Sequence, residues 1–238
     1  MNCSAALDTS CNASLAVKRG PDVIVNERLA ARGRHSDREL MPWLMQCLES
    51  VNVTLADIEK WTVGTGPGSY SGVRAGIALV RGISRGADAH CRGISSSRAL
   101  ARQCRSQFAD GAHIAVLHDA RRQQVIASVY KVDGRCVRVK APPQILARET
   151  VAEKAQSWGG VITPHAEELS AVLEALTGQT RIIATEYVDA KELLLTRGAW
   201  PSEPAATDAS LEPVYARPAV FVPPKAIRAP AVQSDAKA

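Results

Sequence analysis

The sequence predicts an α/β protein of two lobes, each made of strands followed by helices. At 238 residues the chain exceeds the usual size of one domain and is short for two full ones. Hydrophobic residues make up 46% of it, enough for a packed core, whereas aromatic residues contribute only 4%. A pattern of strands and then helices runs to about residue 105 and then begins again. The repeat of this pattern indicates two similar units.

The first thirty residues predict a meander of three strands. Short apolar runs at 5–7, 13–18 and 23–29 are separated by the turn-forming stretches 9–12 and 19–22. Helices are then expected at about 36–51, 71–87 and 97–104, with strands at about 58–64 and around Gly93. Three strands followed by helix, strand and helix is the order of a ribonuclease H-like lobe.

The second half predicts a similar but thinner unit. Strands are expected at 113–118, 124–132 and 135–140, with Asp133-Gly134 as a hairpin turn signal. Helices are expected at about 148–157, 165–177 and 187–198. Prolines recur from Pro213 onward, and the small, polar end is expected to be disordered. The predicted division is an N-terminal lobe over 1–105, a smaller C-terminal lobe over 106–222 and a disordered tail over 223–238.

Residues 64–76, Gly-Thr-Gly-Pro-Gly-Ser-Tyr-Ser-Gly-Val-Arg-Ala-Gly, lie at an expected strand-to-helix junction. Glycine tolerates positive φ and has no Cβ, so the backbone here can approach another body closely. That body is either a phosphate or another helix. The stretch is not a Walker A loop, because no Gly-Lys-Ser/Thr follows the glycines, and it does not fit G-x-G-x-x-G.

A phosphate site nevertheless stays open at this point. Backbone N–H groups at a helix start can hold an anion. Asp8 ends the first strand and can hold Mg²⁺ through water, although Asp-Thr-Ser is equally typical of a turn. The residues that we consider for a nucleotide or phosphate are Asp8, Thr9, Ser10, Gly66, Gly68 and Ser69.

The first two long helices predict contacts on more than one side. The apolar arc of the helix at 36–51 reaches roughly 200°, wider than a one-sided surface helix needs, although a helix buried within one domain would also account for it. The helix at 71–87 carries four glycines, each of which costs about 1 kcal/mol relative to alanine. Small residues at this spacing favour a seam with another helix. The predicted partner interface consists of Leu40, Met41, Leu44, Met45, Gly72, Ala75, Gly76, Leu79 and Gly82.

A substitution among the small residues of the helix at 71–87 would test the predicted contact with another helix. We expect Gly76→Leu or Ala75→Trp to abolish association and to leave the monomer folded.

Nothing in the sequence assembles into an active site. The five histidines show neither H-x-x-x-H nor H-E-x-x-H spacing, no serine lies in G-x-S-x-G, and the six cysteines form no C-x-x-C pair. We therefore predict no catalytic residue and no metal ligand. The net charge of +5 is compatible with RNA nearby without demonstrating it. Without a signal peptide or a membrane-spanning run, we expect a soluble, cytoplasmic protein and no membrane partner.

Several motifs together carry a resemblance to a known family. They are Leu7-Asp8-Thr9-Ser10, His35-Ser36, the stretch 66–74 (Gly-Pro-Gly-Ser-Tyr-Ser-Gly-Val-Arg), Asp119-Ala120-Arg121-Arg122 and the stretch 211–217 (Leu-Glu-Pro-Val-Tyr-Ala-Arg). The glycine-rich stretch is the most specific of them. With these motifs the chain resembles the TsaB (YeaZ) family over about residues 5–217.

The resemblance implies a two-lobed actin-like (ASKHA) fold, each lobe ribonuclease H-like and the second reduced. It implies a cytoplasmic, non-catalytic subunit of the complex that makes threonylcarbamoyladenosine next to the anticodon of tRNA. The implied partners are a TsaD-type catalytic paralogue, a TsaE-type ATPase and a second copy of the chain, with tRNA contacted indirectly. No cofactor of its own is implied, although ATP or ADP can bind at the subunit junction.

Two alternatives remain open. An independent ATP-dependent enzyme of the actin-like superfamily would need an acidic metal ligand in the second lobe, where Asp119 is the candidate. Asp119 is also expected to pair with Arg121. A glycoprotease-like peptidase is the other alternative, and it lacks a nucleophile or metal set in the sequence.

Overall fold

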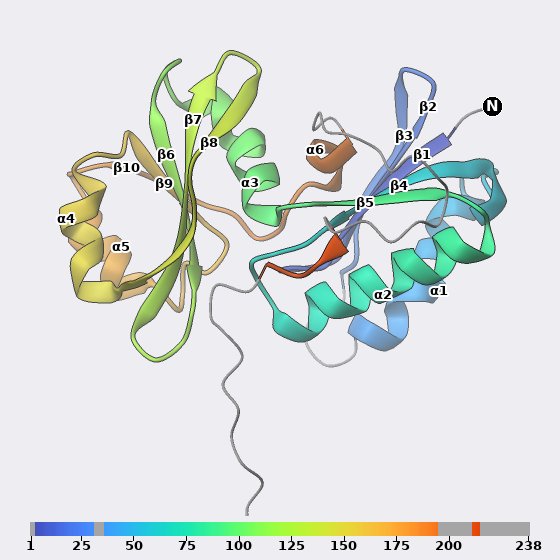
Figure 1. The fold of residues 1–238 in the computed structure, drawn as a ribbon, viewed down its shortest axis with the longest axis horizontal. Helices are drawn as coiled ribbons and strands as arrows, with labels where there is room; N and C mark the ends of the chain where they lie inside the picture. Colours follow the sequence, from blue (N-terminus) through green and yellow to red (C-terminus); the bar gives the residue numbers. More distant parts are fainter. Residues whose placement is uncertain (1–2, 31–35, 195–210, 215–238) are drawn as a thin grey trace, which may run out of the picture.

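Two five-stranded sheets form two lobes that lie next to each other (Figure 1). The structure is a computed structural model and describes residues 3–30, 36–194 and 211–214. In the first sheet the strand order is β3-β2-β1-β4-β5. The strands β1, β2 and β3 form an antiparallel meander, and β4 and β5 add in parallel to β1. Their bounds are β1 (Cys3–Asp8), β2 (Ser14–Arg19), β3 (Asp22–Arg28), β4 (Ile58–Gly64) and β5 (His90–Ile94).

The second sheet repeats this connectivity in the order β10-β9-β6-β7-β8. Again three antiparallel strands are followed by two that add in parallel to the first of them. Their bounds are β6 (His113–Asp119), β7 (Gln124–Asp133), β8 (Cys136–Ala147), β9 (Gly160–Thr163) and β10 (Arg181–Ala184). A duplicated ribonuclease H-like sheet is the architecture of an actin-like protein, so the predicted fold class is confirmed.

The second lobe is reduced in its helices rather than in its strands. Strands β9 and β10 complete its sheet, and the sequence pattern did not predict them because each is only four residues long. The helices α4 (Val151–Ala155) and α5 (Ser170–Leu176) are short, whereas α1 (Ser36–Glu49) and α2 (Tyr70–Gly86) have 14 and 17 residues. Among the described residues, short 3-10 turns lie at Leu55–Asp57, Arg105–Gln107 and Arg148–Thr150.

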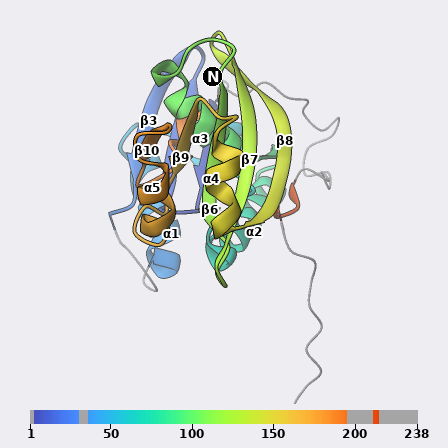
Figure 2. The ribbon, with the colours of Figure 1, turned by 90° about the vertical axis from the view of Figure 1, so that its left-hand side faces the viewer.

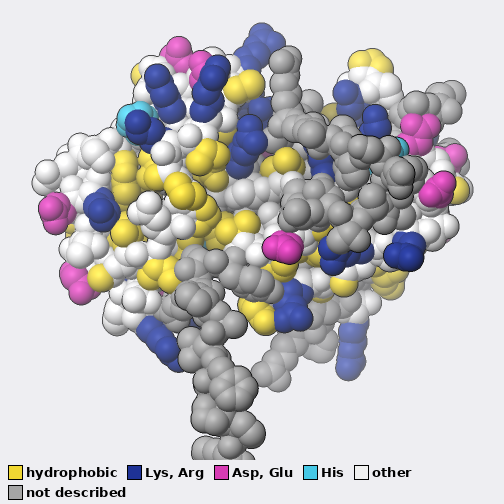
Figure 3. Space-filling view, in the orientation of Figure 1, with side chains coloured by type: hydrophobic (Ala, Val, Ile, Leu, Met, Phe, Trp, Pro, Cys, Tyr) yellow, Lys and Arg dark blue, Asp and Glu magenta, His cyan; other side chains and the backbone are white. Residues whose placement is uncertain are grey.

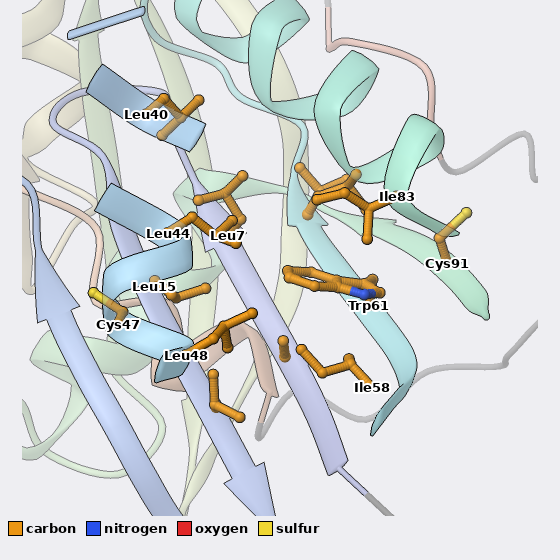
Figure 4. Close-up of a cluster of buried hydrophobic side chains, with 14 of the residues drawn as sticks. Leu7, Leu15, Leu40, Leu44, Cys47, Leu48, Ile58, Trp61, Ile83 and Cys91 are labelled. Atoms are coloured by element: carbon orange, nitrogen blue, oxygen red, sulfur yellow. The ribbon is translucent and has the colours of Figure 1, made fainter. Parts of the chain in front are cut away.

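Helices α1 and α2 lie side by side on one face of the first sheet, where the core of this lobe is built (Figures 1 and 4). The inward positions of α1 follow the helical period, so one row of side chains is removed from water. Trp61 of β4 is fully buried between the two helices and the sheet. The α1 side chains of this core are Leu40, Leu44, Cys47 and Leu48.

The two lobes exchange helices. Helix α3 (Ser96–Cys104) follows the first sheet in the chain but packs on the second, and α6 (Ala190–Leu194) follows the second sheet but packs on β1 and β2. Arg102 of α3 and Glu192 of α6 form a buried ion pair of 3.1 Å between them. One apolar cluster therefore continues from Ala6 in the first sheet to Ile114 in the second. This shared core fixes the lobes against each other.

The remaining face of the second sheet is covered by α4 and α5, which lie in front of the strands in Figure 2. Residues 215–238, which include the expected tail at 223–238, lie outside the described residues. Within the described part of the chain, no helix combines the length and the hydropathy needed to cross a bilayer.

Candidate functional site

The glycine-rich stretch approaches the turn between β1 and β2 of its own lobe. A Cβ atom at Gly72 would lie 2.3 Å from the carbonyl oxygen of Thr9, and one at Gly76 would lie 2.2 Å from Thr9 Oγ1. The Thr9 hydroxyl donates a hydrogen bond of 2.7 Å to the carbonyl of Gly72. Gly68 meets the same turn, because its Cβ would lie 2.3 Å from the carbonyl oxygen of Ser10. These three glycines therefore allow the start of α2 to pack directly against the β1–β2 turn.

This packing corrects one expectation. We now expect Gly76→Leu to destabilise the monomer rather than leave it folded, because even a methyl group at Gly76 would lie 2.2 Å from Oγ1 of the buried Thr9. The variant would disturb the lobe itself before it could report on association.

Asp8 is fully buried and lies at the centre of a network of serines. Its carboxylate accepts hydrogen bonds from the Ser10 backbone N–H (2.8 Å), the Ser10 hydroxyl (2.6 Å) and the Ser96 hydroxyl (2.6 Å). Burial raises the pKa of Asp8 above its ordinary value, and these hydrogen bonds oppose part of that shift. A Cβ at Gly64 would lie 1.8 Å from Asp8 Oδ2, so this carboxylate points into the lobe.

Two backbone donors of the glycine-rich loop are also engaged inside the lobe. The Gly66 N–H donates to the Ser96 hydroxyl (3.0 Å), and the Ser69 N–H donates to the carbonyl of Ser10 (2.6 Å). Ser69 caps α2 by accepting the N–H of Gly72 at 3.3 Å. The fold thus brings together the six residues predicted for a phosphate. Their hydrogen bonds run partly among themselves and partly to Ser96 and Gly72. The phosphate assignment itself stays a prediction.

A cleft of about 1170 Å³ separates this network from the second lobe. Ser10, Cys11 and residues 65–70 line one side, and residues 119–121 with His165 and Glu168 line the other. The end of the described chain also borders it, because the Val214 N–H donates to the carbonyl of Thr65 at 2.8 Å.

Asp119, on the far wall of the cleft, is paired within its own lobe. Asp119 accepts from Arg148 at 3.0 Å and lies 3.5 Å from Arg121, so the expected Asp119–Arg121 pair is confirmed. Behind it, the buried His118 lies 2.9 Å from the Ser97 hydroxyl and 5.5 Å, ring to ring, from His165. Burial, with a smaller contribution from the charge of His165, lowers the pKa of His118 to about 3, so this imidazole is neutral.

Sequence reasoning did not find His165, Glu168 or Arg148. The first two follow β9, whose four residues gave no strand signal, and Arg148 lies beyond the predicted end of the third strand. Over the described ranges, no group of three or more His, Cys, Asp or Glu side chains is placed to hold a metal ion.

The predicted interface residues divide into an inner and an outer set. Leu40 and Leu44 are buried in the core of the lobe, and Gly72 and Gly76 pack on Thr9. Gly82 is exposed, and a Cβ there would meet nothing within 4 Å. The accessible set is Met41, Met45, Ala75, Leu79 and Gly82, of which the first four are half-buried. The interface stays a prediction for this outer set.

The duplicated sheets and the cleft between them define an actin-like α/β protein. The sequence model of one family, described as TsaD, tRNA N6-adenosine threonylcarbamoyltransferase, matches residues 27–186, which is more than half of the chain. The chain belongs to this family. The resemblance to TsaB (YeaZ) proteins is also confirmed by named relatives and solved structures.

Two relatives are named tRNA threonylcarbamoyladenosine biosynthesis protein TsaB. The Escherichia coli protein is 24% identical over 212 residues, which cover 77% of this chain and 91% of that protein. The Bacillus subtilis protein is 31% identical over 144 residues, which cover 58% of this chain and 59% of that protein.

Two solved structures from Pseudomonas aeruginosa share the fold. YeaZ superposes with a TM-score of 0.66 at 24% identity, covering 82% of this chain and 90% of that one. A protein described as similar to peptidase YEAZ reaches a TM-score of 0.73 at 23% identity, covering 91% of this chain and 100% of that one.

Proposed function

We propose that this chain is a non-catalytic partner that binds and activates a TsaD-type transferase in the biosynthesis of tRNA threonylcarbamoyladenosine. The name of the Escherichia coli relative, which is matched over 91% of its length, supports the pathway. The observation that carries the partner role is the outer face of α2. Ala75, Leu79 and Gly82 are spaced to lie on one side of the helix, and this side is accessible in the chain alone.

The other parts of the proposal rest on the resemblance to the TsaB (YeaZ) family. The chain has no cofactor of its own, and ATP or ADP binds at the junction with the transferase. A TsaE-type ATPase joins the complex, which works in the cytoplasm and contacts tRNA. The face of α1 and α2 that receives the transferase also serves a homodimer.

One observation favours a second candidate, an independent ATP-dependent enzyme. Asp8 and Asp119 end the first strand of their respective sheets, and the hairpins that follow them both border the cleft. However, Asp8 is held by serines and Asp119 by two arginines. A metal-bound phosphate would have to displace these partners, so we favour the partner role.

The test is reconstitution with the cognate transferase and TsaE-type ATPase. We expect threonylcarbamoyl transfer to tRNA to need this chain, and the purified chain alone to show no turnover. Gly82→Trp should weaken co-sedimentation with the transferase by at least about tenfold, because a large side chain in a tight seam cannot be packed. Ala109→Trp, at an exposed alanine of the other lobe, is the matched control and should associate normally.

Two results would contradict the proposal. ATP turnover by the pure chain that is lost in Asp8→Asn would favour the enzyme. Unchanged association of Gly82→Trp would exclude the outer face of α2 as the seam.

A further inference from the structure

The β7–β8 hairpin carries four exposed basic side chains within ten residues: Lys131, Arg135, Arg138 and Lys140. Figure 3 shows dark blue side chains gathered at this end of the second lobe. Arg138 pairs with Asp133, and Asp110 accepts the N–H of Gly134 at 2.8 Å. For the other three basic residues, the described part of the chain offers no ion-pair partner. We call these four residues the basic hairpin.

Two of these cations lie directly opposite each other in the sheet. In the antiparallel register Lys131 of β7 pairs with Arg138 of β8. Like charges at directly opposed positions are close neighbours on one face and destabilise the pair of strands. The Asp133 carboxylate is bound to Arg138, and the described residues supply no ion-pair partner for Lys131.

Lys140 lies at a bulge in β8. Tyr130 pairs with Val139, and the preceding Val129 pairs with Ala141, so Lys140 is an extra residue with no partner across the strands. Such a bulge bends the strand and re-aims a side chain, and it interrupts the ladder of hydrogen bonds.

Packing does not account for the basic hairpin. The inward residues Val132 and Val137 lie directly opposite each other and are buried, so they fix the register. The basic side chains are exposed and add nothing to that core. The basic side chains therefore place like charges next to each other without contributing to the core, and Asp133 is the ion-pair partner that the described part of the chain supplies to them.

We propose that the basic hairpin binds the phosphate backbone of RNA. Guanidinium and ammonium groups are the usual donors to phosphate, and a phosphate between Lys131 and Arg138 would turn their repulsion into attraction. An acidic protein is the less favoured occupant, because protein interfaces depend on large apolar or aromatic anchors. Val139 is the exposed apolar residue of β8, and along a strand it points to the opposite face from Arg138.

The identity of the RNA as tRNA rests on the proposed function. The proposal goes beyond the expectation that tRNA is contacted only indirectly, because it places a direct contact on this chain. Contacts to phosphates position an RNA without distinguishing its sequence. The basic hairpin would therefore orient the tRNA on the complex and would not select one tRNA over another.

The test is fluorescence anisotropy of the full chain with a labelled tRNA transcript, measured over a range of salt concentrations. The variant is Lys131→Gln/Lys140→Gln. We expect its affinity to fall by about tenfold or more near 0.1 M salt, and the slope of log K against log salt to fall by about two. The matched control is Lys154→Gln/Arg85→Gln, which removes the same charge at exposed sites elsewhere and should bind nearly as the parent chain does.

The outcomes separate this proposal from the proposed function. The variant should still co-sediment with the transferase, because the basic hairpin and the outer face of α2 lie in different lobes. Equal RNA affinity in the variant and the control would overturn the proposal that the basic hairpin binds RNA, and it would leave the proposed partner role intact. Loss of transferase binding with unchanged RNA binding would show that the basic hairpin binds a protein, and it would also overturn the proposal that the hairpin binds RNA. RNA binding that depends on the hairpin, in a chain that binds no transferase, would support the hairpin and contradict the partner role.

Discussion

Two pairs of glycines on α2 have opposite environments. Gly72 and Gly76 touch the β1–β2 turn so closely that neither has room for a Cβ. Gly82 and Gly86, two and three turns further along, would meet nothing within 4 Å. All four weaken the helix by about 1 kcal/mol each relative to alanine. Packing against the β1–β2 turn offsets this loss of stability at Gly72 and Gly76. No contact within the described part of the chain offsets it at Gly82 and Gly86.

The comparison of the two pairs shows how a residue that lowers the stability of the fold can be interpreted. Where the same chain shows what the cost makes room for, the residue is structural, as Gly76 is against Thr9. Where the described part of the chain shows nothing, we propose that the cost serves a binding partner. The opposed Lys131 and Arg138 belong with Gly82 in this second class. The predictions that follow test this distinction.

The largest effect is expected at a compensated glycine. Gly76→Ala gains helix propensity but places a methyl group 2.2 Å from Thr9 Oγ1, so the β1–β2 turn or α2 must shift. We expect a net loss of about 2 to 3 kcal/mol in the free energy of unfolding, measured by urea denaturation. Thr9→Ala in the same background removes the crowding Oγ1, together with its hydrogen bond to Gly72, and should restore part of the lost stability. An unchanged stability would place Gly76 in the uncompensated class.

The buried His118 is a second position whose environment is set by the chain's own packing, and its test is pH. Its folded pKa of about 3 lies below the ordinary value of 6.5, so as pH falls through this window the unfolded state binds the proton first. Stability is complete above about pH 6.5 and is lost on acidification. We expect a loss of about 2 kcal/mol by pH 5, measured by urea denaturation at pH 7 and pH 5.

Two variants separate titration from packing at His118. His118→Phe should flatten this part of the pH dependence. Ser97→Ala should keep it, because it removes only the hydrogen-bonding hydroxyl. An NMR titration of the His118 ring that shows protonation near pH 6 would contradict the prediction even if the Phe variant failed to fold.

The sequence predicted the first lobe closely because its elements are long and periodic. The helix expected at 71–87 is α2 over Tyr70–Gly86, and the strand expected at 58–64 is β4. In the second lobe β9 and β10 were missed, since a run of four residues with two central apolar side chains does not distinguish a strand from a loop. The exchange of α3 and α6 between lobes was also beyond prediction, because a helix's own period does not say which sheet it covers.

The candidate site shows the same limit. The glycine-rich stretch correctly indicated close approach of the backbone, because only glycine fits such contacts. What it approaches, Thr9, is some sixty positions away in the chain and is set by the sheet. The serines around Asp8 come from β1–β2 and α3, so only the fold could reveal a network closed on itself.

A smaller effect of the opposite sign is expected at an uncompensated glycine. Gly82→Ala should stabilise the isolated chain by about 1 kcal/mol, because the added methyl improves helix propensity and meets open space. Association with the transferase should weaken several-fold in the same variant, measured by sedimentation. Ala78→Gly, at an exposed neighbouring position, should instead destabilise the chain by a similar amount. A Gly82→Ala chain that became both more stable and more tightly associated would contradict the reading of Gly82 as a contact position.

The smallest effect is expected at the basic hairpin. Lys131→Gln removes one of two like charges that face each other across β7 and β8, so it should raise the free energy of unfolding by about 0.5 kcal/mol at low salt. The gain should vanish in high salt, because exposed charges are screened. Lys154→Gln, an exposed lysine on α4, should show neither the gain nor its salt dependence. A residue whose removal stabilises the chain while weakening RNA binding is kept for the ligand rather than for the fold, whereas a loss of stability in Lys131→Gln would place it with the compensated residues.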